Sequence, residues 1–200
     1  MKVAIINGSP RKNSQSLKIS NYLMEAYKHK SAEVSLISLE GNPFPLWEDG
    51  ADRNTVAGGK LKSALETLKD CELFVVVSPE YNGMVPSSLI NFLQQVGHAE
   101  LGHKPGLIVS VSAGRGGAYP VLELRNFGYK NARYSMIPDH LIVRDAENVL
   151  NQEKAEGPGD EFIRNKIDYT LDVSLEYLKA YRQIRSSGVV DFKNHGNGMS

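Results

Sequence analysis

Short apolar runs alternate with longer amphipathic stretches along the whole chain. Five of the short runs have the apolar or β-branched composition that is typical of strands: Val3–Ile6, Val34–Leu39, Leu73–Val77, Leu107–Val111 and His140–Val143. The third run is apolar at every position, as expected for a central parallel strand that is covered on both faces. The second run is less continuous, which favours a place nearer the edge of the sheet.

Five longer stretches carry apolar residues at helical spacing. The first helix is expected to begin near Ser14 and to bury a face that includes Ile19 and Leu23. The others are expected from Ala57 to about Asp70, from Pro86 to Val96, up to about Phe127, and from Ile163 to about Arg185. Pro86 suits the first turn of its helix, because an N–H group has no intrahelical acceptor there.

The segment Glu40–Asn54 is predicted to be a loop, since it contains Gly41, Pro43, Pro45 and Gly50. It also carries Phe44, Leu46 and Trp47, which are large and apolar for a solvated connection. Either these side chains fold back on the core, or they form a binding surface or a partner contact. The second interpretation is preferred.

Strands that alternate with helices predict an α/β fold: a doubly wound, five-stranded parallel sheet in the order 2-1-3-4-5 with helices on both faces. No repeat or second domain is evident, so residues 1–185 are expected to form a single domain. The remaining residues, 186–200, are rich in Gly and Asn and are expected to form a C-terminal tail, which would normally be mobile unless a contact, for example with another subunit, holds it.

Charge and composition exclude several classes of protein. The 200 residues include 23 basic and 23 acidic side chains, so no net charge draws the chain to nucleic acid or to an anionic membrane. The apolar opening is too short for a signal peptide and no run reaches membrane-spanning length, so a cytoplasmic protein is expected. Cys71 is the single cysteine, and it is interpreted as a core residue rather than a nucleophile.

Metal and hydrolase chemistry are also poorly supported. The five histidines are scattered and form no H-x-x-x-H or H-x-H pair beside carboxylates, so no metal site is expected; they are His29, His98, His103, His140 and His195. The G-x-S-x-G turn of a serine hydrolase is absent from the sequence. The chemistry must therefore come from another feature of the chain.

That feature is the segment Asn7–Ser16, which follows the first strand. Ser9, Ser14 and Ser16 supply hydroxyl groups, and Arg11 lies beside Lys12. A helix that begins near Ser14 leaves its first N–H groups free, and such groups bind anions. The sequence therefore predicts a phosphate site, and charge-assisted hydrogen bonds of about 1.5–3 kcal/mol each would hold the phosphate.

The segment matches neither of the common phosphate-binding motifs. It lacks the G-K-[ST] of a P-loop, and Gly8 is followed by Ser-Pro-Arg instead of the pattern G-x-G-x-x-G. What remains suits one terminal phosphate. The alternative is that Ser14 or Ser16 only caps the helix and that Arg11 is a solvated loop charge.

Two further loops are expected at the same edge of the sheet. Residues 78–83 follow the third strand and contain Asn82-Gly83, which can take a left-handed turn or serve as a simple connection to the next helix. Residues 112–117 follow the fourth strand and contain three glycines, so a planar group could approach the backbone closely. The ligand of a doubly wound sheet lies outside the carboxyl ends of its strands, so the three loops should meet at one crevice.

Three motifs in these loops resemble the NAD(P)H-dependent FMN reductase family, a flavodoxin-like family that includes quinone, chromate and azo-dye reductases. They are G-S-P-R-K-N-S-Q-S from Gly8, P-E-Y-N-G-M-V-P from Pro79 and S-A-G-R-G-G from Ser112. The resemblance is strongest up to about Tyr119. It departs at Ser16, where relatives commonly have Asn, and at Asn91-Phe92, where they often have Lys-Asn.

The resemblance implies a site residue by residue. The FMN phosphate would be held by Ser9, Arg11, Ser14, Gln15 and Ser16. The edge of the isoalloxazine ring would lie along Pro79, Glu80, Tyr81, Asn82 and Gly83, and the other side of the ring system would lie against Ser112, Gly114, Arg115 and Gly116. Arg115 would favour the reduced, anionic ring or would simply be solvated. Glu80 is a possible proton donor, although a loop carboxylate of this kind is more often solvated.

The function implied is transfer of a hydride from NADPH or NADH through FMN to a small-molecule acceptor such as a quinone, an azo compound, a metal oxyanion or free flavin. Relatives are usually dimers or tetramers, so a homodimer or homotetramer is expected. Two other functions remain open. A flavodoxin-type electron carrier would be strongly acidic, which this neutral chain is not, and a binder of a phosphorylated metabolite would carry no flavin.

Overall fold

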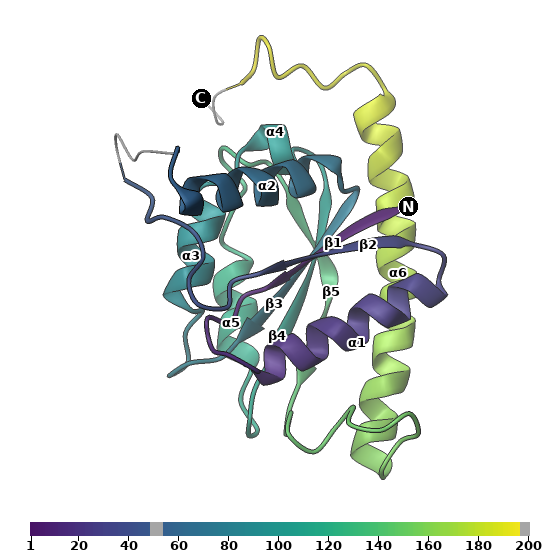
Figure 1. Ribbon diagram of the computed structural model, residues 1–200. Helices are drawn as coiled ribbons and strands as arrows, with labels where there is room; N and C mark the ends of the chain where they lie inside the picture. The colour runs from purple at the N-terminus through teal and green to yellow at the C-terminus, as the bar shows by residue number, and fades with distance from the viewer. Residues whose placement is uncertain (49–53, 197–200) are drawn as a thin grey trace.

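The computed structural model describes residues 1–48 and 54–196. Its centre is a five-stranded parallel sheet in the order β2-β1-β3-β4-β5, which confirms the predicted fold (Figure 1). The strands are β1 (Lys2–Asn7), β2 (Glu33–Ser38), β3 (Leu73–Pro79), β4 (Pro105–Val111) and β5 (Ser135–Val143). The expectations for Gly50 and for the last four residues of the tail fall outside the described residues.

Helices cover both faces of the sheet (Figure 1). They are α1 (Gln15–His29), α2 (Val56–Asp70), α3 (Ser87–Gln94), α4 (His98–Leu101), α5 (Ala118–Leu124) and α6 (Pro158–Ser186). One apolar core joins α1 and α6 to the sheet, with Ile19 and Leu171 fully buried. The second core joins α2, α3, α4 and α5 to the opposite face, with Leu61 and Leu89 buried.

Burial follows the predicted order of the strands. Every residue of β3 and of β4 is buried, as expected for strands with a neighbour on each side and helices on both faces. In β2 exposed positions alternate with partly buried ones until Ile37, which confirms its place at the edge. The carboxyl ends of β1, β3 and β4 therefore lie side by side in the middle of the sheet.

Several element boundaries differ from the predictions; for example, α6 begins at Pro158 rather than Ile163, and β4 begins at Pro105 rather than Leu107. β5 begins at Ser135 rather than His140, because a register shift opposite Gly106 and Ile108 accommodates Pro138 within the strand. The short helix α4 was not predicted, so the described residues contain six helices rather than five. α5 ends at Leu124 instead of near Phe127.

The loop after β2 contains one large apolar side chain that folds back on the core and two that stay exposed. Phe44 folds back and stacks on Phe92 of α3, with the ring centroids 4.9 Å apart. Asn91 holds the loop to α3, because its side chain accepts from Trp47 N at 2.7 Å and donates to the Pro45 carbonyl at 2.9 Å. The Leu46 and Trp47 side chains remain exposed.

The C-terminal segment packs against the region of α4. The Phe192 ring lies 4.6 Å from the His98 ring and 5.6 Å from the His103 ring, measured between centroids. A Cβ atom at Gly102 would lie 2.5 Å from the Phe192 ring, so glycine provides the space for it. Phe192 therefore holds the tail against the domain, and the domain boundary at residue 185 stays a prediction.

Cys71 is the C-cap of α2, two residues before β3 begins. It is buried, and its Sγ lies 3.1 Å from the Leu68 carbonyl oxygen. This environment suits a core residue. Across the two described ranges, the structure has no helix with the length and apolar character needed to cross a membrane.

Candidate functional site

The loop after β1 leaves the sheet through a narrow gap at Gly8. The Gly8 N–H donates to the Val77 carbonyl of β3 at 2.8 Å. A Cβ atom at this position would lie 2.7 Å from Leu89 Cδ2 and 2.9 Å from the Val77 oxygen. The close approach of β3 and α3 therefore requires glycine here.

Ser9 lies behind the loop rather than on its surface. It is fully buried, its hydroxyl accepts from the Arg11 N–H at 3.3 Å, and its Oγ lies 2.9 Å from the Tyr81 hydroxyl oxygen. The bond to Tyr81 joins the first loop to the turn that follows β3. Ser9 is thus a link between two loops in this structure.

Ser14 and the first turn of α1 form the anion-binding end of the loop. Ser14 is the N-cap, and its hydroxyl accepts from the Leu17 N–H at 3.1 Å. The N–H groups of Gln15 and Ser16 follow directly, where a helix has no internal acceptors for them, and the first turn has no acidic side chain. The capping alternative is therefore confirmed for the Ser14 hydroxyl, but the turn that it caps remains suited to an anion.

Asn82-Gly83 forms the predicted left-handed turn after β3. Its φ values are 51° and 75°, and two backbone bonds between Tyr81 and Met84, of 2.9 and 3.1 Å, close it. Successive left-handed residues of this kind are typical of a type I′ turn. The turn projects Tyr81 toward the first loop, where its hydroxyl meets Ser9.

The loop after β4 is held on two sides. The Glu80 carboxylate accepts from the Gly117 N–H, so Glu80 is not the solvated carboxylate that was expected. On the other side Arg144 Nε donates to the carbonyls of Arg115 and Gly116, at 2.8 and 3.0 Å. Both partners act on the loop backbone and therefore fix its path, while the Arg115 side chain remains exposed.

All three loops line one cleft of about 300 Å³ at the carboxyl end of the sheet. Its walls are Arg11, Lys12, Asn13, Ser14, Gln15, Ser16, Pro79, Glu80, Tyr81, Val111, Ala113 and Glu147. Seven of the predicted site residues are among them: Arg11, Ser14, Gln15, Ser16, Pro79, Glu80 and Tyr81. The other seven do not line it: Ser9, Asn82, Gly83, Ser112, Gly114, Arg115 and Gly116.

Sequence reasoning missed several contributors. Glu147 lies in the connection between β5 and α6, and Arg144 directly follows β5. Their signal was position alone, since the carboxyl end of every parallel strand lies at the same edge of the sheet. Val111 and Ala113 also line the cleft, but neither side chain has a chemical property that would single it out from sequence.

The residues present fit a phosphorylated ligand with a planar part. Arg11 and Lys12 place two cations at the end of the cleft where the first N–H groups of α1 are available. Gln15 Oε1 is buried with no hydrogen-bond partner among the described residues, and Gln15 lines the same cleft. A hydroxyl of a bound ligand would satisfy this oxygen, or the amide would donate to a phosphate in the flipped orientation. Within residues 1–48 and 54–196, no three His, Cys, Asp or Glu side chains are grouped so as to hold a metal ion.

The sheet order and a ligand cleft between the ends of β1, β3 and β4 define a flavodoxin-like protein. The sequence model of the NADPH-dependent FMN reductase family matches residues 1–148, and the chain belongs to this family. It is therefore an NAD(P)H-dependent FMN reductase, with FMN as the cofactor and NADPH or NADH as the electron donor.

Two relatives are similar to this chain in sequence, and a solved structure is similar to it in fold. An NADPH azoreductase from Bacillus sp. strain OY1-2 is 28% identical over 153 residues, which cover 74% of this chain and 82% of that protein. An NAD(P)H-dependent FMN reductase from Saccharomyces cerevisiae is 27% identical over 132 residues, covering 59% of this chain and 68% of that protein. The structure of the Paracoccus denitrificans flavoenzyme FerB, an NAD(P)H:(acceptor) oxidoreductase, superposes with a TM-score of 0.71 at 18% identity, covering 90% of this chain and 98% of FerB.

Proposed function

We propose that the three-loop cleft binds FMN and that the protein passes electrons from NAD(P)H to a planar aromatic acceptor of the quinone or azo class. The observation that carries this proposal is the convergence of three separate strand-end loops on one cleft. Arg11, Lys12 and the first turn of α1 line the cleft together with Pro79, Glu80 and Tyr81 of the turn after β3. An FMN molecule has the matching parts, a phosphate and a planar ring.

Residues at the end of β1 would bind the phosphate. Arg11 and Lys12 supply charge, and the backbone N–H groups of Gln15 and Ser16 supply directed donors. Each charge-assisted hydrogen bond is worth about 1.5–3 kcal/mol, so a few of them suffice to retain the cofactor. Ser9 would act indirectly, because it holds Tyr81 in place.

Residues at the ends of β3 and β4 would orient the ring. FMN, when bound, accepts a hydride from the nicotinamide and supplies two electrons to the acceptor. The turn 79–83 and the loop 112–116 are joined through Glu80 and Gly117, so the two ring-facing backbones form one rigid unit. Arg115 is exposed on this unit and would stabilise negative charge that develops on the ring.

The surface next to this unit supports an aromatic acceptor. The Tyr119 side chain is 65% exposed and that of Met84 is 55% exposed. Tyr119 Cδ2 would lie 3.6 Å from a Cβ atom at Gly83, so the tyrosine stands directly beside the turn. An exposed aromatic ring and a thioether suit a flat apolar molecule better than a hydrated oxyanion. The Bacillus relative, which is named an azoreductase, agrees with this class.

The test is a spectrum followed by a turnover assay. The purified protein, supplied with FMN, should show the absorption of a bound flavin, and NADPH or NADH oxidation should rise on adding menadione or methyl red. Chromate and free FMN are the comparison acceptors and should be slower. A bound flavin without NAD(P)H turnover would indicate an electron carrier, and failure to bind FMN at all would indicate a binder of another phosphorylated metabolite.

We also infer a homodimer or homotetramer with a cytoplasmic location, as the sequence predicted. The oligomer is supported by the exposed side chains of Leu46 and Trp47, which are 72% and 59% exposed on a loop that α3 holds in place. Light scattering coupled to size-exclusion chromatography would measure the mass. A monomer at micromolar concentration would contradict the inference.

A further inference from the structure

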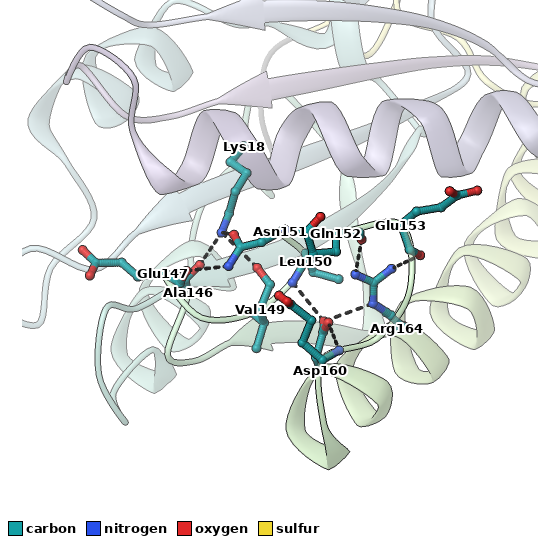
Figure 2. A network of polar contacts seen from close by, with 11 residues as sticks. Lys18, Ala146, Glu147, Val149, Leu150, Asn151, Gln152, Glu153, Asp160 and Arg164 are labelled. Atoms are coloured by element: carbon teal, nitrogen blue, oxygen red, sulfur yellow. Dashed lines mark hydrogen bonds and ion pairs between the residues drawn. The ribbon is translucent and has the colours of Figure 1, made fainter.

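Lys18 makes an unusual set of contacts close to the cleft. It lies on α1, one turn after Ser14, and its side chain crosses to the connection between β5 and α6 (Figure 2). There Lys18 Nζ donates to the Ala146 carbonyl at 2.6 Å, to the Val149 carbonyl at 2.9 Å and to Asn151 Oδ1 at 2.7 Å. An ammonium group has three donors, and here all three are used on neutral oxygens.

The segment that receives these bonds, residues 144–151, is called the brace below. Its backbone is bonded to the loop after β4: Ala146 N–H donates to the Ser112 carbonyl at 3.2 Å, and Asp145 N–H donates to the Gly114 carbonyl at 3.0 Å. Arg144 Nε adds bonds to two further carbonyls of the same loop. The brace and the loop 112–117 therefore form one unit.

Lys18 thus connects two walls of the cleft. One wall is the first turn of α1, which carries Ser14, Gln15 and Ser16. The other consists of the loop after β4, represented by Ala113, and of Glu147 from the brace itself. Within the brace, Asn151 Nδ2 donates to the Glu147 carbonyl at 2.8 Å, so the residue that accepts from Lys18 also holds Glu147.

The far end of the connection is fixed independently of Lys18. Asp160 at the start of α6 is buried and accepts from Leu150 N–H at 2.9 Å, from Glu156 N–H at 3.0 Å and from Arg164 Nε at 3.1 Å (Figure 2). These bonds tie the distal part of the connection to α6. The part nearest the cleft is bonded to the loop after β4 and reaches α1 through Lys18, so loss of Lys18 would leave the brace on that loop but remove these hydrogen bonds to α1.

We propose that Lys18 is a positioning residue that sets the spacing between the phosphate-binding and ring-binding walls of the FMN site. This inference rests on the proposed function, because it takes the cleft as the FMN site. A ligand held at both ends gains from the second contact only if the two walls are correctly spaced. Lys18 fixes that spacing without touching the ligand.

The energetic setting agrees with such a role. Burial lowers the pKa of Lys18 below its ordinary value, and the charges of Asp160 and Glu147 offset only part of this effect. An ammonium kept in a partly buried place must be compensated by good hydrogen bonds, and the brace supplies all of them. The three acceptors are therefore a specific arrangement around this side chain.

The test compares FMN with riboflavin, which lacks the phosphate. In the wild-type protein the riboflavin dissociation constant divided by the FMN dissociation constant measures how much the phosphate contact adds to ring binding. Lys18→Met should reduce this ratio by about tenfold, because the phosphate and the ring can no longer be bound together in the correct geometry. The visible circular dichroism of saturated FMN should change as well, since the ring environment shifts.

Lys104 provides a matched control. Its Nζ also donates to backbone carbonyls, those of Leu68 and Lys69, at 2.8 and 2.7 Å. Lys104 directly precedes β4 and therefore lies at the amino ends of the strands, whereas the cleft lies at their carboxyl ends. Lys104→Met should lower the melting temperature and leave the ratio of the riboflavin to the FMN dissociation constant unchanged. Lys18→Arg, which keeps a cation with several donors, should retain most of the wild-type ratio.

The outcomes separate the two proposals. If the wild-type protein binds no FMN, the proposed function fails. If it binds FMN and Lys18→Met lowers only the melting temperature, as Lys104→Met does, the inference about Lys18 is wrong and the function stands. Should Lys18→Met not fold, Asn151→Ala removes one acceptor of the same ammonium, and an unchanged ratio in that variant would equally overturn the inference.

Discussion

The Ser9 hydroxyl oxygen lies 2.9 Å from the Tyr81 hydroxyl oxygen, although 72 positions separate the two residues along the chain. The contact joins the loop after β1 to the turn after β3 inside the protein, with Ser9 fully buried. It therefore fixes the distance between two of the three loops that line the cleft. Ser9 contributes to the site through the residue that it holds.

Tyr81→Phe and Ser9→Ala should each destabilise the protein by about 1 kcal/mol, because each substitution leaves the other hydroxyl of a part-buried hydrogen bond without its partner. The double variant should lose less than the sum, since both changes remove the same bond. Urea unfolding followed by circular dichroism measures the cycle. Effects that add within about 0.3 kcal/mol would show that the two hydroxyls do not interact.

Arg11→Ala should weaken FMN binding by about tenfold or more, the equivalent of one charge-assisted hydrogen bond to a phosphate. Riboflavin has no phosphate, so its dissociation constant should not change. Isothermal titration with both ligands checks this. A similar loss for both ligands would place Arg11 at the ring and not at the phosphate.

Gly116→Ala should separate the two ring-facing loops. The new Cβ atom would lie 2.6 Å from Glu80 Oε2, so it should displace the carboxylate from the Gly117 N–H. We expect a loss of about 1 kcal/mol in unfolding free energy together with weaker FMN binding. Gly114→Ala is the control for the unfolding free energy, because a Cβ atom there meets nothing within 4 Å. An equal loss of unfolding free energy from the two substitutions would contradict the prediction.

Cys71 should be unreactive toward Ellman's reagent at pH 8 in the folded protein and fully reactive in denaturant. Burial raises the pKa of its thiol to about 11, and the charges of Lys104 and Arg185 offset only part of this rise. In the unfolded chain the pKa of the thiol is near its ordinary value of 9.0, so the thiol ionises more readily there than in the folded protein. The contribution of the buried, neutral thiol to folding stability is therefore complete below pH 9.0 and is lost as the pH rises to about 11. Cys71→Ala should flatten this decline, and rapid labelling of the native protein would contradict the account.

Asp160 should make the protein sensitive to acid. Burial alone would raise the pKa of this carboxyl, but the bonds from Arg164 and from the N–H groups of Glu156 and Leu150 hold the pKa below its ordinary value. Because the pKa of Asp160 is lower in the folded than in the unfolded protein, its carboxylate stabilises the fold at pH values above the unfolded-state pKa of about 4. This stabilisation is lost as the pH falls through the folded-state pKa.

Asp160→Asn removes both the charge and one set of acceptor lone pairs, so it should cost about 3 kcal/mol at pH 7 and much less at low pH. Unfolding free energies measured at several pH values provide the check. A pH-independent effect would mean that the charge of Asp160 is not what stabilises the connection.

The predictable part of the site was local chemistry at strand ends. The motif from Gly8 to Ser16 and the Asn82-Gly83 turn are contiguous, and their residue types alone indicate an anion site and a left-handed turn. The convergence of the loops followed from topology, because the carboxyl ends of adjacent parallel strands lie together. The fold was predictable for the same reason, since alternating strand and helix patterns leave few arrangements.

The parts that sequence could not provide depend on contacts between distant residues. Glu80 was expected in solvent but bonds to Gly117, and Arg144 supports a loop that ends almost thirty positions earlier. The predicted last strand began too late because Pro138 interrupts its pattern of apolar residues. Only the pairing with β4 shows that β5 also includes the residues before Pro138. Ser9 looked like a phosphate ligand, and its burial beside Tyr81 became visible only in three dimensions.

The close packing around Gly8 affects how much conformational entropy the protein loses when it binds FMN. The chain is held there by Val77 and by the side chain of Leu89, both parts of the apolar interior, so its course does not depend on an occupant. A binding site that already has its bound conformation loses little conformational entropy when the ligand binds. The protein without cofactor should accordingly bind FMN quickly and with a small entropic penalty, and should release it without local unfolding of this loop.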